Sequence, residues 1–301
     1  MKTLTTIILL VIGLAASAQQ EYMFTQYMFN GLAINPAYAG SHEALSVTAM
    51  HRDQWVGMDG APSTQTLAVH SPIRQKHIAV GALFVRDQIG VTTDHTLFGS
   101  YAYKIDHHNY HLSFGLQAGF SMFNNDLSNV QLTNQDDQRF YGNGESAFLP
   151  NAGVGVYFYL PQFYAGLSVP QLFTNKYSEN SDRIAGQVRH YFLTVGAVFP
   201  ISRNVKWKPN LMMRAADRSG FGLDINSSFL FNDIVWIGAS YRHQESVDII
   251  FELQLSAHFR FGYAYDISTN GLNNANAGSH ELVINYRFTR GARRLMNPRN
   301  F

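Results

Sequence analysis

The feature that most constrains this chain is a two-residue alternation of apolar and polar side chains that returns in segment after segment. Between Ser113 and Phe123, the even positions hold Phe, Leu, Ala, Phe and Met, and the odd positions hold Ser, Gly, Gln, Gly and Ser up to Ser121. Similar divisions begin at Phe221, Val247 and Glu281. Successive side chains of a strand point to opposite faces, so each segment has one face suited to lipid and one suited to water.

From Leu45 onward, fourteen such segments are separated by clusters of Gly, Asn, Asp, Ser and Pro. They lie near residues 45–55, 64–73, 76–87, 93–106, 110–124, 148–160, 162–172, 188–200, 204–217, 220–232, 233–244, 247–256, 259–267 and 279–290. An open sheet edge in hydrocarbon leaves backbone groups without partners, so a spanning sheet must close, and bacterial barrels close with an even number of strands.

We therefore predict an all-β fold, a closed transmembrane antiparallel β-barrel of about 14 strands over residues 45–290. A soluble β-sandwich or adhesin is the alternative, because its strands also alternate. The aromatic content of 14% and the regular spacing of the apolar faces favour the barrel.

The two ends of the chain differ from this pattern. Residues 1–18 have the order of a secretory signal peptide, with Lys2, an apolar run over residues 7–14 and a small-residue cleavage site at residues 16–18. The alternative is a membrane anchor, but the apolar run is shorter than the roughly 20 residues of a spanning helix. We expect residues 19–44 to form an N-terminal periplasmic segment and residues 291–301 to form a basic C-terminal tail.

Connections between the predicted strands are of two kinds. Pro161-Gln162, Asn232-Asp233 and Ala257-His258 are short and are expected to be periplasmic turns. Residues 124–147 and 175–187 are long and polar and are expected to be extracellular loops.

Composition excludes several functions. The formal net charge of +1 argues against nucleic acid as a ligand, since binding it needs a concentrated basic face. The chain has no cysteine, which excludes disulfides, thiolate metal sites and cysteine nucleophiles.

Two groups of residues raise the question of a metal site. His107, His108 and His111 fall at a turn between predicted strands, and no acidic or cysteine residue has ligand spacing to them. Asp136 and Asp137 lack the spaced oxygen ligands and the turn glycine of a calcium loop. We expect no metal and no cofactor.

Serine-dependent lipid hydrolysis is the enzymatic activity most natural to a small membrane barrel. The chain has no G-x-S-x-G motif, and its serines and histidines are scattered, so no nucleophile stands out. We expect no catalytic residue and no enzymatic activity.

Two regions carry unusual polar residues. Residues 50–64 place a tryptophan and charged residues at a strand end before a Gly/Pro turn, which indicates an interfacial Trp and a hairpin loop. Arg52, His280 and Glu281 are predicted to form a polar cluster in the lumen; the alternative is ordinary hydrogen bonding in the barrel interior.

Six short motifs lie in order along the chain. They are residues 26–30 (QYMFN), 34–40 (INPAYAG), 52–57 (RDQWVG), 61–66 (APSTQT), 262–266 (GYAYD) and 278–281 (GSHE). With them the chain resembles the PorP/SprF family of outer-membrane proteins of the type IX secretion system of Bacteroidota. The middle of the chain is similar only in strand pattern. One departure is the basic tail, with Arg290, Arg293, Arg294 and Arg299, because many barrels stop at an aromatic residue; insertion then relies either on the extreme C-terminus or on Phe288.

The resemblance implies a non-enzymatic outer-membrane barrel that supports the secretion or surface anchoring of proteins with a C-terminal secretion domain, such as gliding adhesins. It also implies contacts with other type IX secretion components in the periplasm and outer membrane, and with membrane lipid. The motifs nominate as candidate partner-binding residues Asn35, Pro36, Arg52, Gln54, Trp55, Pro62, Thr64, Tyr265, Asp266, His280 and Glu281.

A passive porin or nutrient channel is the competing function. A lumen that contains Asp224, Glu252, Gln254 and Arg260 has the polarity for conduction.

Overall fold

The computed structural model describes residues 23–73, 77–126, 145–175, 177, 186–217 and 219–288. The expected signal peptide, the basic tail, and Asp136 and Asp137 lie outside the described residues. None of the described helices is long and apolar enough to cross a membrane.

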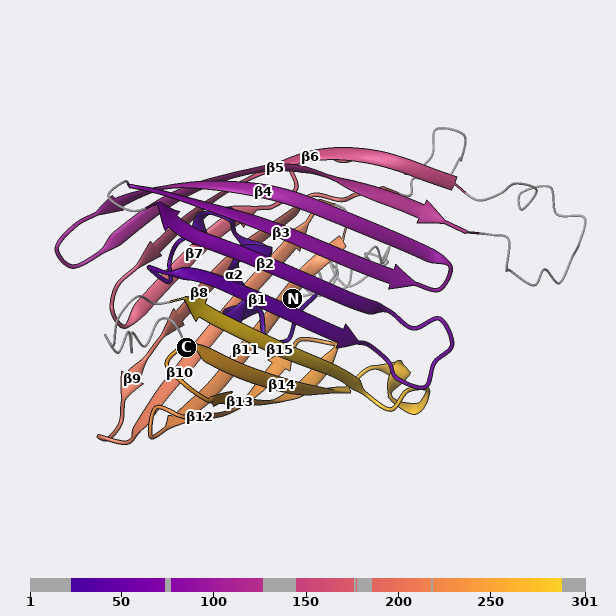
Figure 1. The fold of residues 1–301 in the computed structure, drawn as a ribbon. Helices are drawn as coiled ribbons and strands as arrows, with labels where there is room; N and C mark the ends of the chain where they lie inside the picture. The colour runs from indigo at the N-terminus through magenta and orange to yellow at the C-terminus, as the bar shows by residue number, and fades with distance from the viewer. Residues whose placement is uncertain are drawn as a thin grey trace, which may run out of the picture.

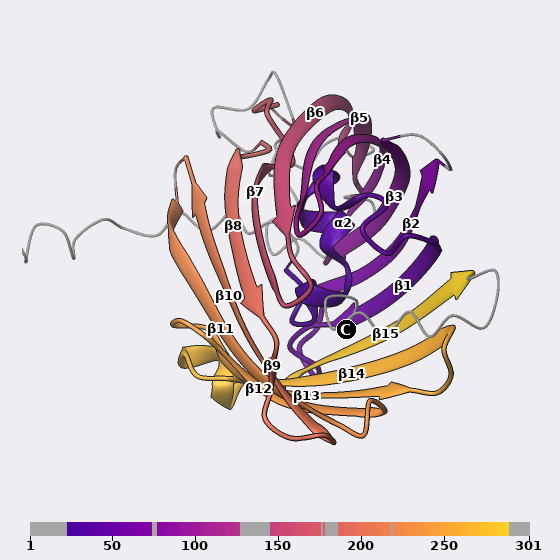
Figure 2. The same cartoon turned by 90° about the vertical axis from the view of Figure 1, so that its left-hand side faces the viewer.

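The strands form one closed antiparallel barrel (Figures 1 and 2). In chain order they are β1 (Leu45–Asp53), β2 (Ser63–Ile73), β3 (Ile78–Ile89), β4 (Thr92–Asp106), β5 (His111–Asn125), β6 (Glu145–Tyr159), β7 (Phe163–Val169), β8 (His190–Ala197), β9 (Phe199–Pro200), β10 (Val205–Ala216), β11 (Ser219–Phe231), β12 (Val235–Arg242), β13 (Ser246–Gln254), β14 (Phe259–Ser268) and β15 (Ser279–Phe288). β15 pairs with β1 from Leu45↔Phe288 to Asp53↔His280, and this pairing closes the sheet.

The predicted strand count of 14 is confirmed. β8 and β9 are two parts of one predicted strand, interrupted at Val198, and both pair with β10. Each of the other thirteen predicted segments contains one strand, with ends that differ by a few residues. The alternation located the strands correctly because one face of each meets lipid and the other does not.

The barrel wall is apolar outside and polar inside. Leu116, Phe148 and Leu167 are each about 60% exposed on the outer face. Asp224, Glu252 and Arg260 face inward and are almost fully buried, as the sequence led us to expect, whereas Gln254 is only partly buried. An exposed apolar band of this kind is stable only in contact with lipid.

The two rims of the barrel differ in their connections. The connections β2–β3, β4–β5, β6–β7, β9–β10, β11–β12 and β13–β14 lie at one rim, and each has three or four residues. At the opposite rim, the ends of consecutive strands are separated by more than eight residues in four places, at residues 54–62, 126–144, 170–189 and 269–278. We call the two rims the short-turn rim and the long-loop rim. Most of each predicted loop, at residues 124–147 and 175–187, lies outside the described residues. In bacterial barrels long loops face the cell exterior.

The predicted short turns lie at the short-turn rim. In one of them, both Asn232 and Asp233 have positive φ (52° and 58°), the backbone geometry of a tight hairpin that follows the twist of its strands. His107 and His108 lie in the β4–β5 turn, as expected. The expectation is wrong for His111, which is the first residue of β5 and whose Nδ1 lies 2.5 Å from Asp106 Oδ1.

Residues 23–44 lie inside the barrel, and we call them the plug (Figure 2). They contain three short helical turns, η1 (Tyr27–Phe29), α2 (Gly31–Ile34) and η2 (Pro36–Tyr38). All of them except Gly31 and Glu43 are buried. The expectation of a periplasmic segment is therefore wrong for this described part, because its apolar side chains are covered by the inner wall of the barrel.

Glycines in the wall make room for the plug. Gly115 of β5 and Gly155 of β6 are register partners. A Cβ on Gly115 would lie 2.1 Å from the backbone nitrogen of Ala37, and one on Gly155 would lie 2.1 Å from Oδ1 of Asn35. The close approach of η2 to the wall therefore requires glycine at both positions.

Candidate functional site

Two carboxylates and one guanidinium meet inside the barrel where β1, β14 and β15 lie side by side. Arg52 Nη2 lies 2.6 Å from Asp266 Oδ2, and Arg52 Nη1 lies 3.1 Å from Glu281 Oε2. All three side chains are at most 2% exposed. Arg52 and Glu281 are register partners across the β1–β15 pairing, so closure of the barrel brings them together.

This cluster binds the plug. Glu281 accepts the backbone N–H of Thr25 on Oε2 and that of Gln26 on Oε1, both at 2.8 Å. The Thr25 hydroxyl donates to Asp266 Oδ2 at 2.7 Å and accepts from Arg52 Nη1 at 2.9 Å. We call Thr25, Arg52, Asp266 and Glu281 the latch. Hydrogen bonds to charged groups are about twice as strong as neutral ones, so the latch fixes the start of the plug.

A second guanidinium extends the latch. Arg242 lies 3.3 Å from Asp224 through Nε, and its Nη2 lies 3.4 Å from the Thr25 hydroxyl. Asp248 is fully buried beside Asp266, its register partner on β14. Among the described residues, no group of three His, Cys, Asp or Glu side chains has the geometry to hold a metal ion.

An aromatic ring forms a second attachment of the plug. The Phe29 ring lies 5.1 Å from Lys208 Nζ and 4.8 Å from the Arg260 guanidinium. Glu252 lies 3.1 Å from Arg260. The cations are attracted to the negative face of the ring, which ties η1 to β10 and β14.

The third attachment is Asn35. Its Oδ1 accepts from the backbone nitrogen of Ala37 at 2.9 Å and so caps η2, which Pro36 begins. Its Nδ2 donates to the carbonyl of Val156 at 3.0 Å, with that of Leu167 at 3.5 Å. Asn35 and Pro36 thus lie between the plug and the wall, where a soluble partner cannot reach them.

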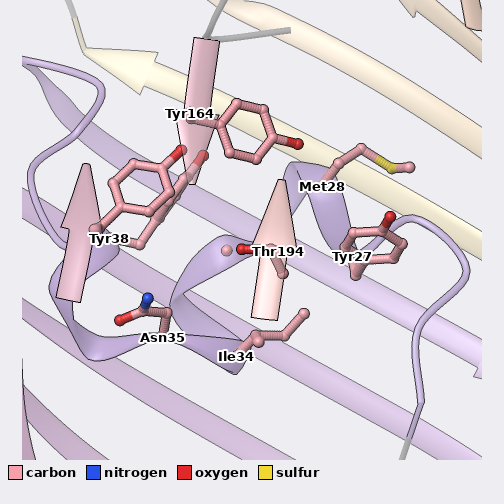
Figure 3. Close-up of a pocket in the computed structure, with 9 residues that line it drawn as sticks. Tyr27, Met28, Ile34, Asn35, Tyr38, Tyr164 and Thr194 are labelled. Atoms are coloured by element: carbon pink, nitrogen blue, oxygen red, sulfur yellow. The ribbon is translucent and has the colours of Figure 1, made fainter. Parts of the chain in front are cut away.

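A small cavity remains between the plug and the wall (Figure 3). Tyr27, Ile34 and Tyr38 of the plug line it opposite Tyr164 and Thr194 of the wall. Its volume of about 20 Å³ is room for a water molecule. The cavity is therefore too small for an organic substrate.

A histidine holds the plug near the short-turn rim. His42 Nε2 lies 2.9 Å from the Tyr38 hydroxyl, and its Nδ1 lies 2.9 Å from the Ser46 hydroxyl. Burial first, and then the charge of Arg287, lower the pKa of His42 well below its usual value. The imidazole is therefore neutral at physiological pH.

At the long-loop rim, two loops distant in sequence are joined. Val56 N donates to Gly278 O at 2.9 Å, and Ala277 N donates to Val56 O at 2.7 Å. Trp55 N donates to the hydroxyl of Ser279 at 3.1 Å. We call residues 54–62 and 269–278 the rim surface; the two loops lie at the same end of the barrel in Figure 1.

The remaining predicted site residues lie in or near the rim surface. Gln54 N donates to Pro62 O at 2.9 Å, which closes the β1–β2 loop. The Thr64 hydroxyl donates to Asp87 at 2.6 Å inside the barrel. Tyr265 is on the outer face, and its hydroxyl donates to Ala277 O at 2.9 Å.

The predicted lumen cluster is confirmed for Arg52 and Glu281 and is wrong for His280. His280 adjoins Glu281 in β15, so it points outward, where Nδ1 lies 2.7 Å from the Tyr263 hydroxyl. Thr25 was missed, because its role depends on a hydrogen bond with Glu281, which lies 256 positions away in the sequence. Arg242 was also missed. It faces the lumen beside Asp224, its register partner, and the alternation of inward and outward positions along the strand is the sequence signal that points to it.

The closed barrel with its apolar outer band defines a class, the outer-membrane β-barrel proteins. A family model described as "Type IX secretion system membrane protein PorP/SprF" matches residues 16–286. The chain therefore belongs to the PorP/SprF family, as its motifs predicted.

Solved structures share the fold. The chain is similar to the CymD monoaromatic hydrocarbon channel, with 12% identity, a TM-score of 0.53, and coverage of 87% of this chain and 93% of that one. It is also similar to the outer-membrane protein Omp33 of Acinetobacter baumannii, with 8% identity, a TM-score of 0.50, and coverage of 82% and 98%. No curated protein matches the chain.

Proposed function

We propose that this barrel binds, at its long-loop rim, a partner protein that bears a C-terminal secretion domain, and so supports its secretion or its anchoring at the cell surface. Membership of a type IX secretion family supplies the context. The observation that carries the proposal is that four of the six motifs meet at this rim, namely residues 52–57, 61–66, 262–266 and 278–281. The motif at residues 26–30 lies directly beneath the rim, where Glu281 of the latch binds it.

The rim surface has the properties of a preorganised binding site. Backbone hydrogen bonds join its two loops, and another joins Gly60 to Gly90 of the neighbouring hairpin at 2.9 Å. Trp55 has a positive φ of 48°, a conformation that its surroundings must hold in place. A surface that is already ordered loses little conformational entropy on binding, so more of the contact energy appears as affinity.

The presence of the plug in the lumen argues against the alternative function of a passive porin or nutrient channel. Its contacts reach β6 through Asn35, β10 through Phe29 and β15 through Gln26, so they extend around the lumen. The structural neighbours include a hydrocarbon channel, but at 12% identity they support only the fold.

Binding in vitro tests the proposal. The full-length mature barrel in nanodiscs is titrated with the secretion domain of a protein whose surface display depends on the gene. We expect Trp55→Ala to weaken this binding at least about tenfold, the loss typical of a buried aromatic contact at an interface.

Trp207→Ala is the matched control, because Trp207 lies near the short-turn rim and should leave binding unchanged. Absence of binding by the wild-type barrel, or equal binding by the Trp55→Ala variant, would contradict the proposal.

A further inference from the structure

Four polar side chains stand side by side on the lipid-facing surface near the long-loop rim. His51 of β1 pairs in register with Gln65 of β2, Gln65 with Arg86 of β3, and Arg86 with His95 of β4. Their respective sequence neighbours Arg52, Thr64, Val85 and Thr96 are buried inside the barrel, so the four face outward. We call His51, Gln65, Arg86 and His95 the outer polar row.

The outer polar row marks the edge of the apolar band. Two positions along each strand toward the short-turn rim, the next outward-facing residues are Ala49, Leu67, Phe84 and Leu97. Two positions toward the long-loop rim, the next outward-facing residues are Asp53, Ser63, Gln88 and Thr93. A change from apolar to polar side chains across a barrel wall occurs where acyl chains give way to headgroups.

The row is local and does not continue around the barrel. Its end residue His51 pairs with Leu282 of β15, and its other end residue His95 pairs with Met122 of β5. Both of these partners are outward and exposed. The four polar side chains are thus bounded by apolar ones on either side.

Two hydrogen bonds to neutral side chains hold the Arg86 guanidinium in place. Its Nη1 donates to Gln65 Oε1 at 2.9 Å, and its Nη2 donates to Gln88 Oε1 at 2.7 Å. Both acceptors are neutral amides, and no carboxylate of the described residues forms an ion pair with Arg86. The carboxylate of Asp53 lies 3.0 Å from His51 instead. A guanidinium has five N–H donors, so donors remain for an anion.

We propose that the outer polar row binds a phosphate group of a phosphorylated glycolipid of the lipid A type in the outer leaflet, with Arg86 as the principal contact. Arginine matches the geometry of phosphate oxygens through paired N–H donors. Imidazole and amide N–H groups of His95 and Gln65 add donors on either side. The acyl chains of the same lipid would lie against Leu67, Phe84 and Leu97. This site is separate from the rim surface, and its failure would leave the proposed docking function intact.

Lipid binding by single-residue variants tests this site. The full-length mature barrel in detergent is titrated with diphosphorylated lipid A, with phosphatidylglycerol and with inorganic phosphate, and binding is measured by native mass spectrometry. We expect Arg86→Gln to weaken lipid A binding about tenfold, on the scale of one charge-assisted hydrogen bond. Arg86→Lys, which keeps the charge and loses the paired donors, should weaken it less.

The control is Arg203→Gln, the same charge change in an exposed turn at the short-turn rim, and it should bind lipid A as the wild type does. Heat-dependent gel migration verifies that each variant is a folded barrel. The proposal is overturned if Arg86→Gln leaves lipid A binding unchanged, if Arg203→Gln weakens it equally, or if only phosphatidylglycerol or inorganic phosphate binding depends on Arg86.

Discussion

At the scale of single residues, Glu281 joins two parts of the chain that lie more than 250 positions apart. Its carboxylate accepts two backbone N–H groups of the plug and pairs with Arg52, all in a buried site. Glu281→Gln keeps the size of the side chain, but places an amide N–H where a backbone N–H needs an acceptor. We expect a loss of about 2–4 kcal/mol in the free energy of unfolding, because the buried Arg52 guanidinium loses one of its two carboxylate partners and a backbone N–H of the plug loses its acceptor.

Denaturant unfolding in detergent measures this loss. Asp53→Asn is the control, since its ion pair with His51 is nearly half exposed and should contribute less than about 1 kcal/mol. Equal stabilities of the two variants would mean that the latch does not hold the plug.

His42 gives the plug a dependence on pH. Burial lowers the pKa of the folded imidazole below its unfolded value of about 6.5. The stabilisation from keeping the ring neutral is therefore complete above that unfolded pKa and is lost as the pH falls below it. Between pH 7.5 and pH 5, the melting temperature of the wild type should fall more than that of His42→Asn, an uncharged replacement. Parallel pH profiles would exclude His42 as the cause.

At the scale of elements, the position of η2 against the barrel wall depends on the absence of a side chain at Gly115. Gly115→Ala places a Cβ 2.1 Å from the backbone of Ala37, so either the plug or β5 must shift. We expect a loss of about 1–3 kcal/mol in stability, and faster proteolysis of the plug. Gly99→Ala in β4, where the nearest atom lies 3.9 Å away, should have neither effect. The two variants are compared by denaturant unfolding and limited proteolysis.

The same elements show how far sequence reasoning extends. Each strand could be predicted because alternation is a local signal of a wall between two environments, as in residues 113–123 of β5. The plug could not be predicted, because apolar and polar side chains do not alternate along residues 23–44. Its structure also depends on wall glycines more than 70 positions away, such as Gly115. The latch was predicted only in part: parity places Arg52 and Glu281 inside, but only closure of β15 on β1 pairs them.

At the scale of the whole molecule, we expect the plug to block conduction through the lumen. Because its contacts extend around the inner wall, we expect planar-bilayer recordings of the wild-type barrel to show no steady ohmic conductance. Deletion of residues 23–38 should produce open channels, provided that the deleted barrel still folds on a heat-dependent gel. Steady conductance of the wild type, equal to that of the deletion variant, would favour a passive channel.

Barrel closure also brings residues 50–64 and 262–281 together at one rim, where we propose that the partner protein binds. The most direct test is a strain that lacks the gene, complemented with wild type, Trp55→Ala or Trp207→Ala, with proteins in the medium and on the cell surface quantified by mass spectrometry. We predict that the deletion and Trp55→Ala strains lose one or a few proteins with C-terminal secretion domains from the surface, while wild type and Trp207→Ala restore them. Unchanged surface and medium proteins in the deletion strain would contradict the account.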